Sequence, residues 1–279
     1  VDCDTGEVAP ETITADLTVT MAAIKQGMLR FPAADLVGEL LVARIGHVYD
    51  TPTWQAVRRI APDQAIVRSL LPRRPRYSHK GTFGTALIVA GSRKYTGAAL
   101  LAGKAAYRVG AGLVTLGVPE SLHAVLAGSL AEATWLLLPE EGGVIAESAT
   151  QLVLDHLSRV TALLIGPGLG QEDTTGHFME QLLGCSPDGM CGRPASPGSA
   201  LVDKKSTESK LPPMVVDADG LKLLARLPNW TTCLPPLSVL TPHPGEMAVL
   251  TGLSREALQG DRVAIAEHYA KQWGHIVVL

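Results

Sequence analysis

The run Leu240-Thr241-Pro242-His243-Pro244-Gly245-Glu246 places a histidine and a carboxylate on one turn between an apolar strand and a helical pattern. Each proline fixes its own φ and favours extended geometry in the residue before it, so the turn holds His243 in one orientation. A turn of this kind, at a strand end, is typical of a ligand-binding loop in an open α/β sheet. The simpler alternative is that a helix starts here, with Glu246 serving its dipole and His243 on a solvated turn.

Two aspartates follow another apolar strand, Met214-Val215-Val216. Asp217 and Asp219 are candidates to orient a substrate hydroxyl, to bind a phosphate held by Mg²⁺, or only to cap the next helix. Together with His243 and Glu246 on the next loop, they favour recognition of hydroxyl groups and polyanions over four unrelated accidents.

Two glycine-containing loops are candidates for phosphate binding. In the run Gly166-Pro167-Gly168-Leu169-Gly170, glycine lets the backbone approach a ligand, and we expect Gly166 and Gly170 to contact phosphate. Lys80 and Gly81 stand in a second such loop, for which an ordinary turn into a strand is the alternative. The chain contains neither the G-x-G-x-x-G nor the G-x-x-x-x-G-K-[ST] spacing, which disfavours a hydride-transfer Rossmann enzyme and a P-loop kinase.

Short apolar strands alternate with helical patterns from residue 77 onward, which predicts a mostly parallel sheet with helices on both faces. Small or polar residues follow four of these strands, and the carboxyl ends of parallel strands share one edge, so we expect a pocket rim there. We expect strands at 85–92, 113–118, 162–165, 214–216, 237–240 and 275–279, with a helix at 97–109 and another after Pro119.

The chain divides into three zones. Residues 1–46 contain a strand at 17–21 and an apolar run at 38–46, too little to bury a core alone, so this zone is typical of the end of a larger domain. Residues 47–76 form a connector with one amphipathic helix expected at 54–71. Residues 77–279 form the main α/β domain, and the Gly-, Pro- and Ser-rich stretch 184–212 within it is expected to be a disordered surface insertion.

Composition excludes several functional classes. The net charge is −3 without a basic stripe, so binding to nucleic acid has little electrostatic support. No apolar run approaches the roughly 20 residues that span a bilayer, and no signal-peptide pattern opens the chain, which predicts a cytoplasmic protein without a membrane segment. The four cysteines and the histidines lack the spacing of a zinc site.

Six ordered motifs over about 200 residues closely resemble the ADP/ATP-dependent NAD(P)H-hydrate dehydratase family. The first zone resembles the C-terminal end of the Rossmann-like NAD(P)H-hydrate epimerase domain, which bacteria often fuse ahead of the dehydratase. The dehydratase motifs are His79-Lys80-Gly81-Thr82-Phe83-Gly84, Ala90-Gly91-Ser92, Gly97-Ala98-Ala99, Gly166-Pro167-Gly168-Leu169-Gly170, Val216-Asp217-Ala218-Asp219 and Thr241-Pro242-His243-Pro244-Gly245-Glu246.

The resemblance implies a ribokinase-like fold and a role in metabolite repair. In the family, a nucleotide phosphorylates the hydroxyl carried by the damaged ring of NADH or NADPH, and elimination of phosphate restores the cofactor. It implies that Ala98, Gly168 and His243 contact the hydrate, with Asp217 and Asp219 nearby. The expected ligands are NADH or NADPH hydrate and ADP or ATP with Mg²⁺, while the epimerase part would interconvert the hydrate epimers and bind K⁺.

The family's Lys-Gly phosphate loop and Ala-Gly-Thr-Gly-Asp motif, with the catalytic aspartate, would follow the strand that here ends at Leu279. The epimerase aspartate and its potassium-binding serine would lie before Val1. We therefore expect the sequence to be the middle of a bifunctional lyase and isomerase, able to bind its ligands but not to turn them over by itself.

Two alternatives differ from this reading in class. A small-alcohol kinase of ribokinase-like architecture would share the sheet and the glycine turns, although the His-Pro-Gly-Glu loop favours the dehydratase. A non-catalytic nucleotide-binding remnant would bind NADH hydrate or ADP without forming product. Likeness to bacterial fusions favours ADP over ATP, and we expect a homo-oligomer.

Overall fold

The computed structural model describes residues 1–185 and 211–279, which form two compact units, Val1–Pro75 and Arg76–Leu279. Most of the stretch expected to be a disordered insertion, residues 186–210, lies outside the described residues. Cys185 and Leu211, which flank it, are buried in the core of the second unit. These two flanking residues are therefore fixed by packing.

The first unit contains a parallel pair of strands, β1 (Leu17–Met21), which is the predicted strand, and β2 (Glu39–Ala43), which lies within the apolar run at 38–46. The Thr18 hydroxyl donates to the carbonyl of Val37 at 2.6 Å, and the Lys25 ammonium donates to the carbonyl of Ala23 at 3.0 Å. Leu17, Val19 and Met21 on β1 stay exposed. The assignment of this zone to an epimerase domain remains a prediction.

The single helix expected at 54–71 is wrong. Two short helices form instead, α1 (Pro52–Gln55) and α2 (Gln64–Leu70), with Pro62 between them. Proline lacks an N–H and disfavours helical geometry in the residue before it, so one continuous helix cannot run through Pro62. The Asp63 carboxylate then starts α2 by accepting a hydrogen bond from the N–H of Ile66 at 2.8 Å.

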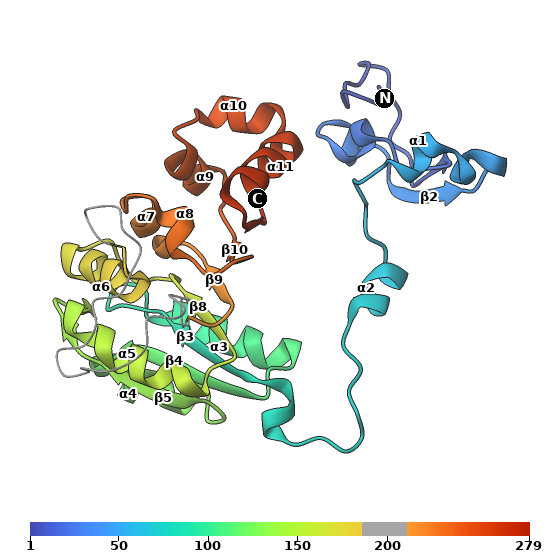
Figure 1. The fold of residues 1–279 in the computed structure, drawn as a ribbon. Helices are drawn as coiled ribbons and strands as arrows, with labels where there is room; N and C mark the ends of the chain where they lie inside the picture. Colours follow the sequence, from blue (N-terminus) through green and yellow to red (C-terminus); the bar gives the residue numbers. More distant parts are fainter. Residues whose placement is uncertain (186–210) are drawn as a thin grey trace. The chain divides into compact units, whose positions relative to one another are not determined.

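The second unit is built on a seven-stranded sheet in the order β11-β10-β9-β8-β3-β4-β5, and every pair in it is parallel (Figure 1). Six strands were expected, although β10 and β11 are each only two residues long, and β5 was missed. The strands are β3 (Thr85–Val89), β4 (Leu113–Pro119), β5 (Thr134–Leu138), β8 (Ala162–Ile165), β9 (Met214–Val216), β10 (Val239–Leu240) and β11 (Ile276–Val277).

Helices cover both faces of this sheet, which confirms the predicted fold class. Successive side chains of a strand point to opposite faces. On β3, Leu87 and Val89 join one core, while Ile88 and the next residue after the strand, Ala90, join the other. The helices α3 (Thr96–Val109) and α4 (Glu120–Leu126) pack on the second core. The first core is covered by α5 (Thr150–His156), α6 (Asp173–Leu183), α7 (Asp219–Leu224) and α8 (Trp230–Cys233).

The direction of the chain through the sheet reverses between β3 and β8. From β3 it proceeds outward through β4 and β5, then returns to β8 on the other side of β3 and continues to β11. A small hairpin, β6 (Glu140–Glu141) with β7 (Val144–Ile145), precedes α5. In open α/β sheets, ligands bind at the carboxyl ends of the strands at such a reversal.

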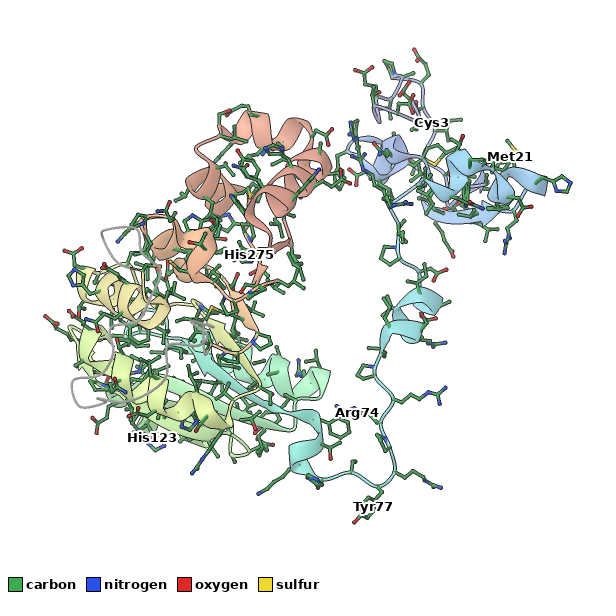
Figure 2. All side chains as sticks on the ribbon, in the orientation of Figure 1. Cys3, Met21, Arg74, Tyr77, His123 and His275 are labelled. Atoms are coloured by element: carbon green, nitrogen blue, oxygen red, sulfur yellow. The ribbon has the colours of Figure 1, made fainter. Side chains whose placement is uncertain are left out.

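The remaining helices follow the short strand β10. They are α9 (Pro244–Thr251), α10 (Arg255–Gly260) and α11 (Arg262–Trp273), and α9 packs beside α7. At the start of the unit the Tyr77 side chain, 97% exposed, projects away from the ribbon (Figure 2). Within the described ranges, no helix is long and apolar enough to span a membrane.

We predict that Leu182→Ala lowers the free energy of unfolding by about 2–5 kcal/mol, because Leu182 on α6 is fully buried and the change leaves a cavity. The matched control is Leu101→Ala on α3, where the side chain is 71% exposed and the expected change is within about 0.5 kcal/mol. Chemical denaturation measures both, and equal effects of the two variants would contradict the two-core description.

Candidate functional site

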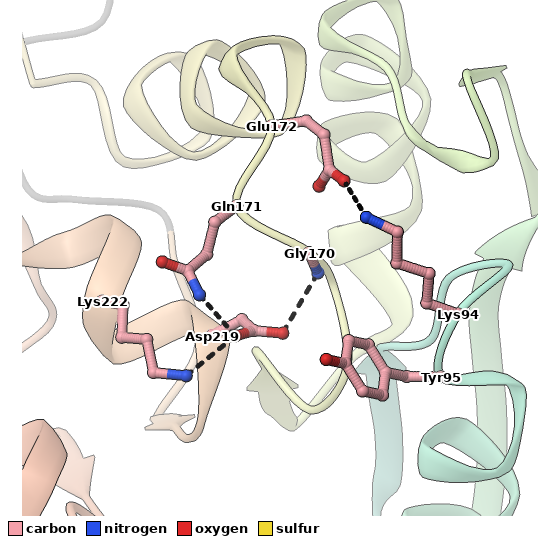
Figure 3. Close-up of a pocket in the computed structure, with 7 residues that line it drawn as sticks. All are labelled: Lys94, Tyr95, Gly170, Gln171, Glu172, Asp219 and Lys222. Carbon is pink, nitrogen blue, oxygen red and sulfur yellow. Dashed lines mark hydrogen bonds and ion pairs between the residues drawn. The ribbon is translucent and has the colours of Figure 1, made fainter.

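A pocket of about 350 Å³ lies at the carboxyl ends of β3, β8 and β9, where the chain direction reverses (Figure 3). Two of its residues follow β3, three follow β8 and two belong to α7, directly after β9. The lining residues are Lys94, Tyr95, Gly170, Gln171, Glu172, Asp219 and Lys222.

The loops after β8 and β9 cross at a distance that only glycine permits. Gly166 has φ +127°, and a Cβ placed on it would lie 1.8 Å from the carbonyl oxygen of Asp217. Its N–H donates to the carbonyl of Val89 at 3.2 Å, and the N–H of Gly91 donates to Pro167 at 2.8 Å. The Gly166 amide is thus engaged within the protein, so this glycine shapes the loop without offering its N–H to a phosphate.

Gly168 brings two of the expected substrate residues together. It has φ +65°, and a Cβ on it would lie 2.7 Å from Cβ of Tyr95 and 2.8 Å from Cβ of Ala98. Gly168 therefore lies directly against the first turn of α3, beside Ala98. Tyr95 takes part in this contact and also lines the pocket, so the two features adjoin.

The carboxylate of Asp219 is buried and fully engaged by the protein. Its Oδ2 accepts a hydrogen bond from the N–H of Gly170 at 3.2 Å, and its Oδ1 accepts from the side-chain amide of Gln171 at 3.2 Å. The ammonium of Lys222 lies 3.1 Å from the same Oδ1. Asp219 was expected to face the substrate, and its carboxylate holds the glycine loop. Gly170 was expected to bind phosphate, and its N–H donates to Asp219.

Arg226, which follows α7, fixes the same loop from a further position. Its guanidinium donates to the backbone carbonyl of Gln171 at 2.9 Å and to the side-chain Oε1 of Gln171 at 3.2 Å. With the contact to Asp219, Gln171 is held at three atoms. These interactions set the shape of the pocket floor.

Ala218 separates the two aspartates with a backbone conformation rare for a residue with a side chain, φ +52° and ψ −121°. Strain of this kind persists only where the surroundings enforce it. It allows Asp219 to face the loop at Gly170 while Asp217 accepts a hydrogen bond from the Thr241 hydroxyl at 2.7 Å. The two carboxylates of one motif therefore serve different neighbours.

His243 and Glu246 form a reciprocal cap at the start of α9. His243 Nδ1 accepts from the N–H groups of Gly245 and Glu246 at 2.9 and 3.3 Å, and Glu246 Oε2 accepts from the N–H of His243 at 3.0 Å. Glu246 is 4% exposed, whereas the imidazole is 64% exposed. Glu246 therefore serves the start of a helix, as the simpler alternative has it. His243 also caps the helix, but its ring is accessible and lies outside the pocket lining.

Lys80 and Gly81 lie at the amino ends of the strands, opposite the pocket. They belong to a short 3-10 helix, Lys80–Phe83, that precedes β3, and the N–H of Gly81 donates to His79 Nδ1 at 3.1 Å. In a parallel sheet the amino ends of strands lie opposite the carboxyl ends, so these two residues are not brought to the glycine loop of Gly166 and Gly170.

Sequence reasoning missed most of the pocket lining, although the signal was present. Each missed residue stands within a few positions of a motif that was recognised: Lys94 and Tyr95 after Ala90-Gly91-Ser92, Gln171 and Glu172 after Gly170, and Lys222 one helical turn after Asp219.

Glu172 is ionised at neutral pH. A hydrogen bond from its own backbone N–H lowers its pKa, desolvation opposes this shift, and the Lys94 ammonium 3.2 Å away lowers the pKa further. Lys94 and Glu172 therefore face each other as an ion pair at the pocket.

Among residues 1–185 and 211–279, no group of three or more His, Cys, Asp or Glu side chains is placed to hold a metal ion. Mg²⁺ in nucleotide sites is usually bound through one or two carboxylates together with substrate phosphates. A site of that kind needs fewer protein ligands than a group of three.

Comparisons with known proteins agree on one family. Residues 86–279 match the family model described as NAD(P)H-hydrate dehydratase. The chain is 37% identical over 280 residues to the bifunctional NAD(P)H-hydrate repair enzyme of Moorella thermoacetica, covering 100% of this chain and 48% of that protein. It is 34% identical to the enzyme of the same name from Salinibacter ruber, covering 99% and 47%. The chain spans about half the length of these relatives.

Two solved structures share the fold. An ADP/ATP-dependent NAD(P)H-hydrate dehydratase from Bacillus subtilis, co-crystallised with ATP and Mg²⁺, is 30% identical with a TM-score of 0.53, covering 77% of this chain and 64% of that one. A ribokinase-like superfamily protein from Enterococcus faecalis has a TM-score of 0.59 over 78% of this chain and 64% of its own, at 22% identity. The ribokinase-like architecture expected from the sequence is confirmed.

We predict that Gly166→Ala lowers the free energy of unfolding by more than about 2 kcal/mol, because its Cβ would collide with the carbonyl of Asp217 at a positive φ. Gly176→Ala on α6 is the control, since a Cβ there meets nothing within 4 Å and alanine favours a helix by about 0.5–1 kcal/mol. Urea denaturation compares the two variants, and a stability of Gly166→Ala equal to the wild type would show that the loops do not cross this closely.

Proposed function

Because the chain belongs to the NAD(P)H-hydrate dehydratase family, we propose that it serves the ADP- or ATP-dependent dehydration of NADH hydrate and NADPH hydrate, as part of a bifunctional repair enzyme. The observation that carries this proposal is the contact of Gly168 with Ala98 and Tyr95 beside a pocket that presents two lysines. Such a site suits a ligand with an uncharged ring and phosphate groups.

The chemistry explains why a nucleotide is needed. Hydroxide is a poor leaving group, so loss of water from the hydrated ring is slow. Transfer of a phosphoryl group from ADP to the ring hydroxyl leaves AMP and a phosphate ester. Expulsion of phosphate with loss of a ring proton then restores the double bond of NADH.

In this proposal Ala98, Gly168 and the exposed imidazole of His243 contact the hydrate. Asp217 lies nearby, since Thr241 connects it to the loop that carries His243. Asp219 and Glu246 act by holding the loops in place, because their carboxylates are engaged within the protein.

The nucleotide brings Mg²⁺ with it, as the co-crystallised Bacillus subtilis relative suggests. Potassium, together with interconversion of the hydrate epimers, belongs to the proposed epimerase part. We further propose a cytoplasmic homo-oligomer that prefers ADP.

The test is recovery of NADH absorbance from NADH hydrate by the full-length protein with ADP and Mg²⁺. We expect absorbance to rise with equal release of phosphate and AMP. Phosphorylation of a vitamin alcohol with the hydrate left untouched would instead identify a small-alcohol kinase. Binding of both ligands without product would identify a nucleotide-binding remnant.

Variants of His243 separate its two roles. His243→Ala removes both the ring and the cap, while His243→Asn keeps a side-chain acceptor suited to the helix N-terminus. We expect both variants to raise KM for NADH hydrate about tenfold and to leave KM for ADP within about twofold. The loss of one hydrogen bond to the hydrate explains this difference between the two KM values. Only His243→Ala should lose about 1 kcal/mol of unfolding free energy.

Steady-state kinetics and denaturation on the same preparations check this prediction. An equal rise of both KM values, or a wild-type KM for hydrate in His243→Asn, would contradict the assignment of His243 to the substrate side.

A further inference from the structure

Two lysines from separate parts of the chain face one pocket. Lys94 lies in the turn between β3 and α3, and Lys222 lies on α7, more than 120 residues later. Figure 3 shows them on opposite sides of the pocket, with Gly170 and Asp219 between them. No motif recognised in the sequence contains either lysine.

Each lysine is paired with an acidic residue whose side chain is less exposed than the lysine side chain. Lys94 lies 3.2 Å from Glu172 Oε1 and its side chain is 74% exposed, against 41% for Glu172. Lys222 lies 3.1 Å from Asp219 Oδ1 and is 32% exposed, against 11% for Asp219. Oε2 of Glu172 has no accessible surface. At this pocket each lysine side chain is therefore more exposed than the carboxylate side chain paired with it.

Both ammonium groups keep donors for a ligand. A lysine ammonium has three N–H donors and no acceptor. Within the described parts of the chain, each of these two lysines makes one ion pair, to Glu172 or to Asp219. An anion can therefore bind without either ion pair being broken, and the carboxylates hold the lysines in position before it arrives.

The size of the pocket and the placement of the charges select the class of anion. A volume of about 350 Å³ lies at the low end for small-molecule sites, so the pocket accommodates part of a dinucleotide and not the whole. Cations on two sides of such a space match a group that carries negative charge at both ends. A diphosphate bridge, with one negative charge on the oxygens of each phosphate, has this form.

We propose that Lys94 and Lys222 bind the diphosphate of the nicotinamide dinucleotide. Tyr95 lines the pocket and also contacts the Gly168 and Ala98 pair, so a ring held at that pair would place its diphosphate beside the lysines. The identity of the dinucleotide rests on the proposed function, but the diphosphate chemistry does not. ADP carries the same group, so the experiment must separate the two sources.

The experiment is a calorimetric titration of the full-length protein with three probes: NADH, ADP, and reduced nicotinamide riboside, which has the ring but no phosphate. The variants are Lys94→Gln and Lys222→Gln, each of which removes one charge and keeps an uncharged polar side chain. Lys271→Gln, at an exposed lysine on α11, is the matched control.

We expect Lys222→Gln to weaken NADH binding about tenfold and Lys94→Gln, whose lysine is more exposed, to weaken it a fewfold. Affinity for the riboside and for ADP should stay at the wild-type value in both variants, and Lys271→Gln should match the wild type throughout. Lys222→Arg, which keeps the charge, should recover most of the lost affinity and so distinguish binding from a fold defect.

Unchanged NADH affinity in both glutamine variants would overturn the proposal, as would a wild type that does not bind NADH. Loss of ADP affinity with NADH affinity intact would also overturn it, by assigning the pocket to the nucleotide. Lysine-dependent NADH binding in a protein that leaves NADH hydrate unrepaired would sustain this inference while the proposed function fails.

Discussion

The buried carboxylate of Asp219 is the interaction on which the rest of the site depends. It joins the start of α7 to Gly170 and Gln171, almost 50 residues earlier in the chain, and it also holds Lys222. A buried carboxylate is costly unless donors surround it, and here a backbone N–H, an amide and an ammonium do so. Without it, the N–H of Gly170 would lose its acceptor, and the floor of the pocket would lose its connection to α7.

The other features of the site act through this connection. Gly166 lets the loops after β8 and β9 cross, and the strained backbone of Ala218 turns Asp219 toward one loop and Asp217 toward another. Arg226 adds two hydrogen bonds to Gln171. The reversal of chain direction between β3 and β8 opens the space in which these loops meet. The sheet thus determines where the pocket lies, and the contacts between the loops determine its shape.

Hydrophobic pattern was sufficient to predict the architecture and the edge of the sheet that carries the site. Apolar runs with helices between them predict a parallel sheet whatever the loops do, and the family resemblance is confirmed over residues 86–279, which contain five of the six motifs. The helix expected at 54–71 does not form as one piece, because Pro62 cannot lie inside a continuous helix although the pattern around it is amphipathic. The strand β5 was overlooked although Thr134–Leu138 is apolar almost throughout.

Residue type did not reveal which polar groups are free. Asp219 and Asp217 look alike in sequence, yet the carboxylate of Asp219 is engaged by the loop at Gly170 and Gln171, whereas the carboxylate of Asp217 accepts only from Thr241 among the contacts described. Gly166 and Gly170 look like phosphate binders, yet their amides donate to the protein. Lys80 stands in a recognised motif at the far edge, whereas Lys94 and Lys222 reach the pocket from outside any motif. Such distinctions depend on contacts between distant parts of the chain.

The most direct test of the role of Asp219 is amide hydrogen exchange at Gly170 in Asp219→Ala, compared with Asp217→Ala and the wild type. If Asp219 holds the glycine loop, exchange of the Gly170 amide should accelerate about tenfold or more in Asp219→Ala and stay at the wild-type rate in Asp217→Ala. Unchanged protection of Gly170 in Asp219→Ala would contradict the account, because the loop would then be held by other contacts.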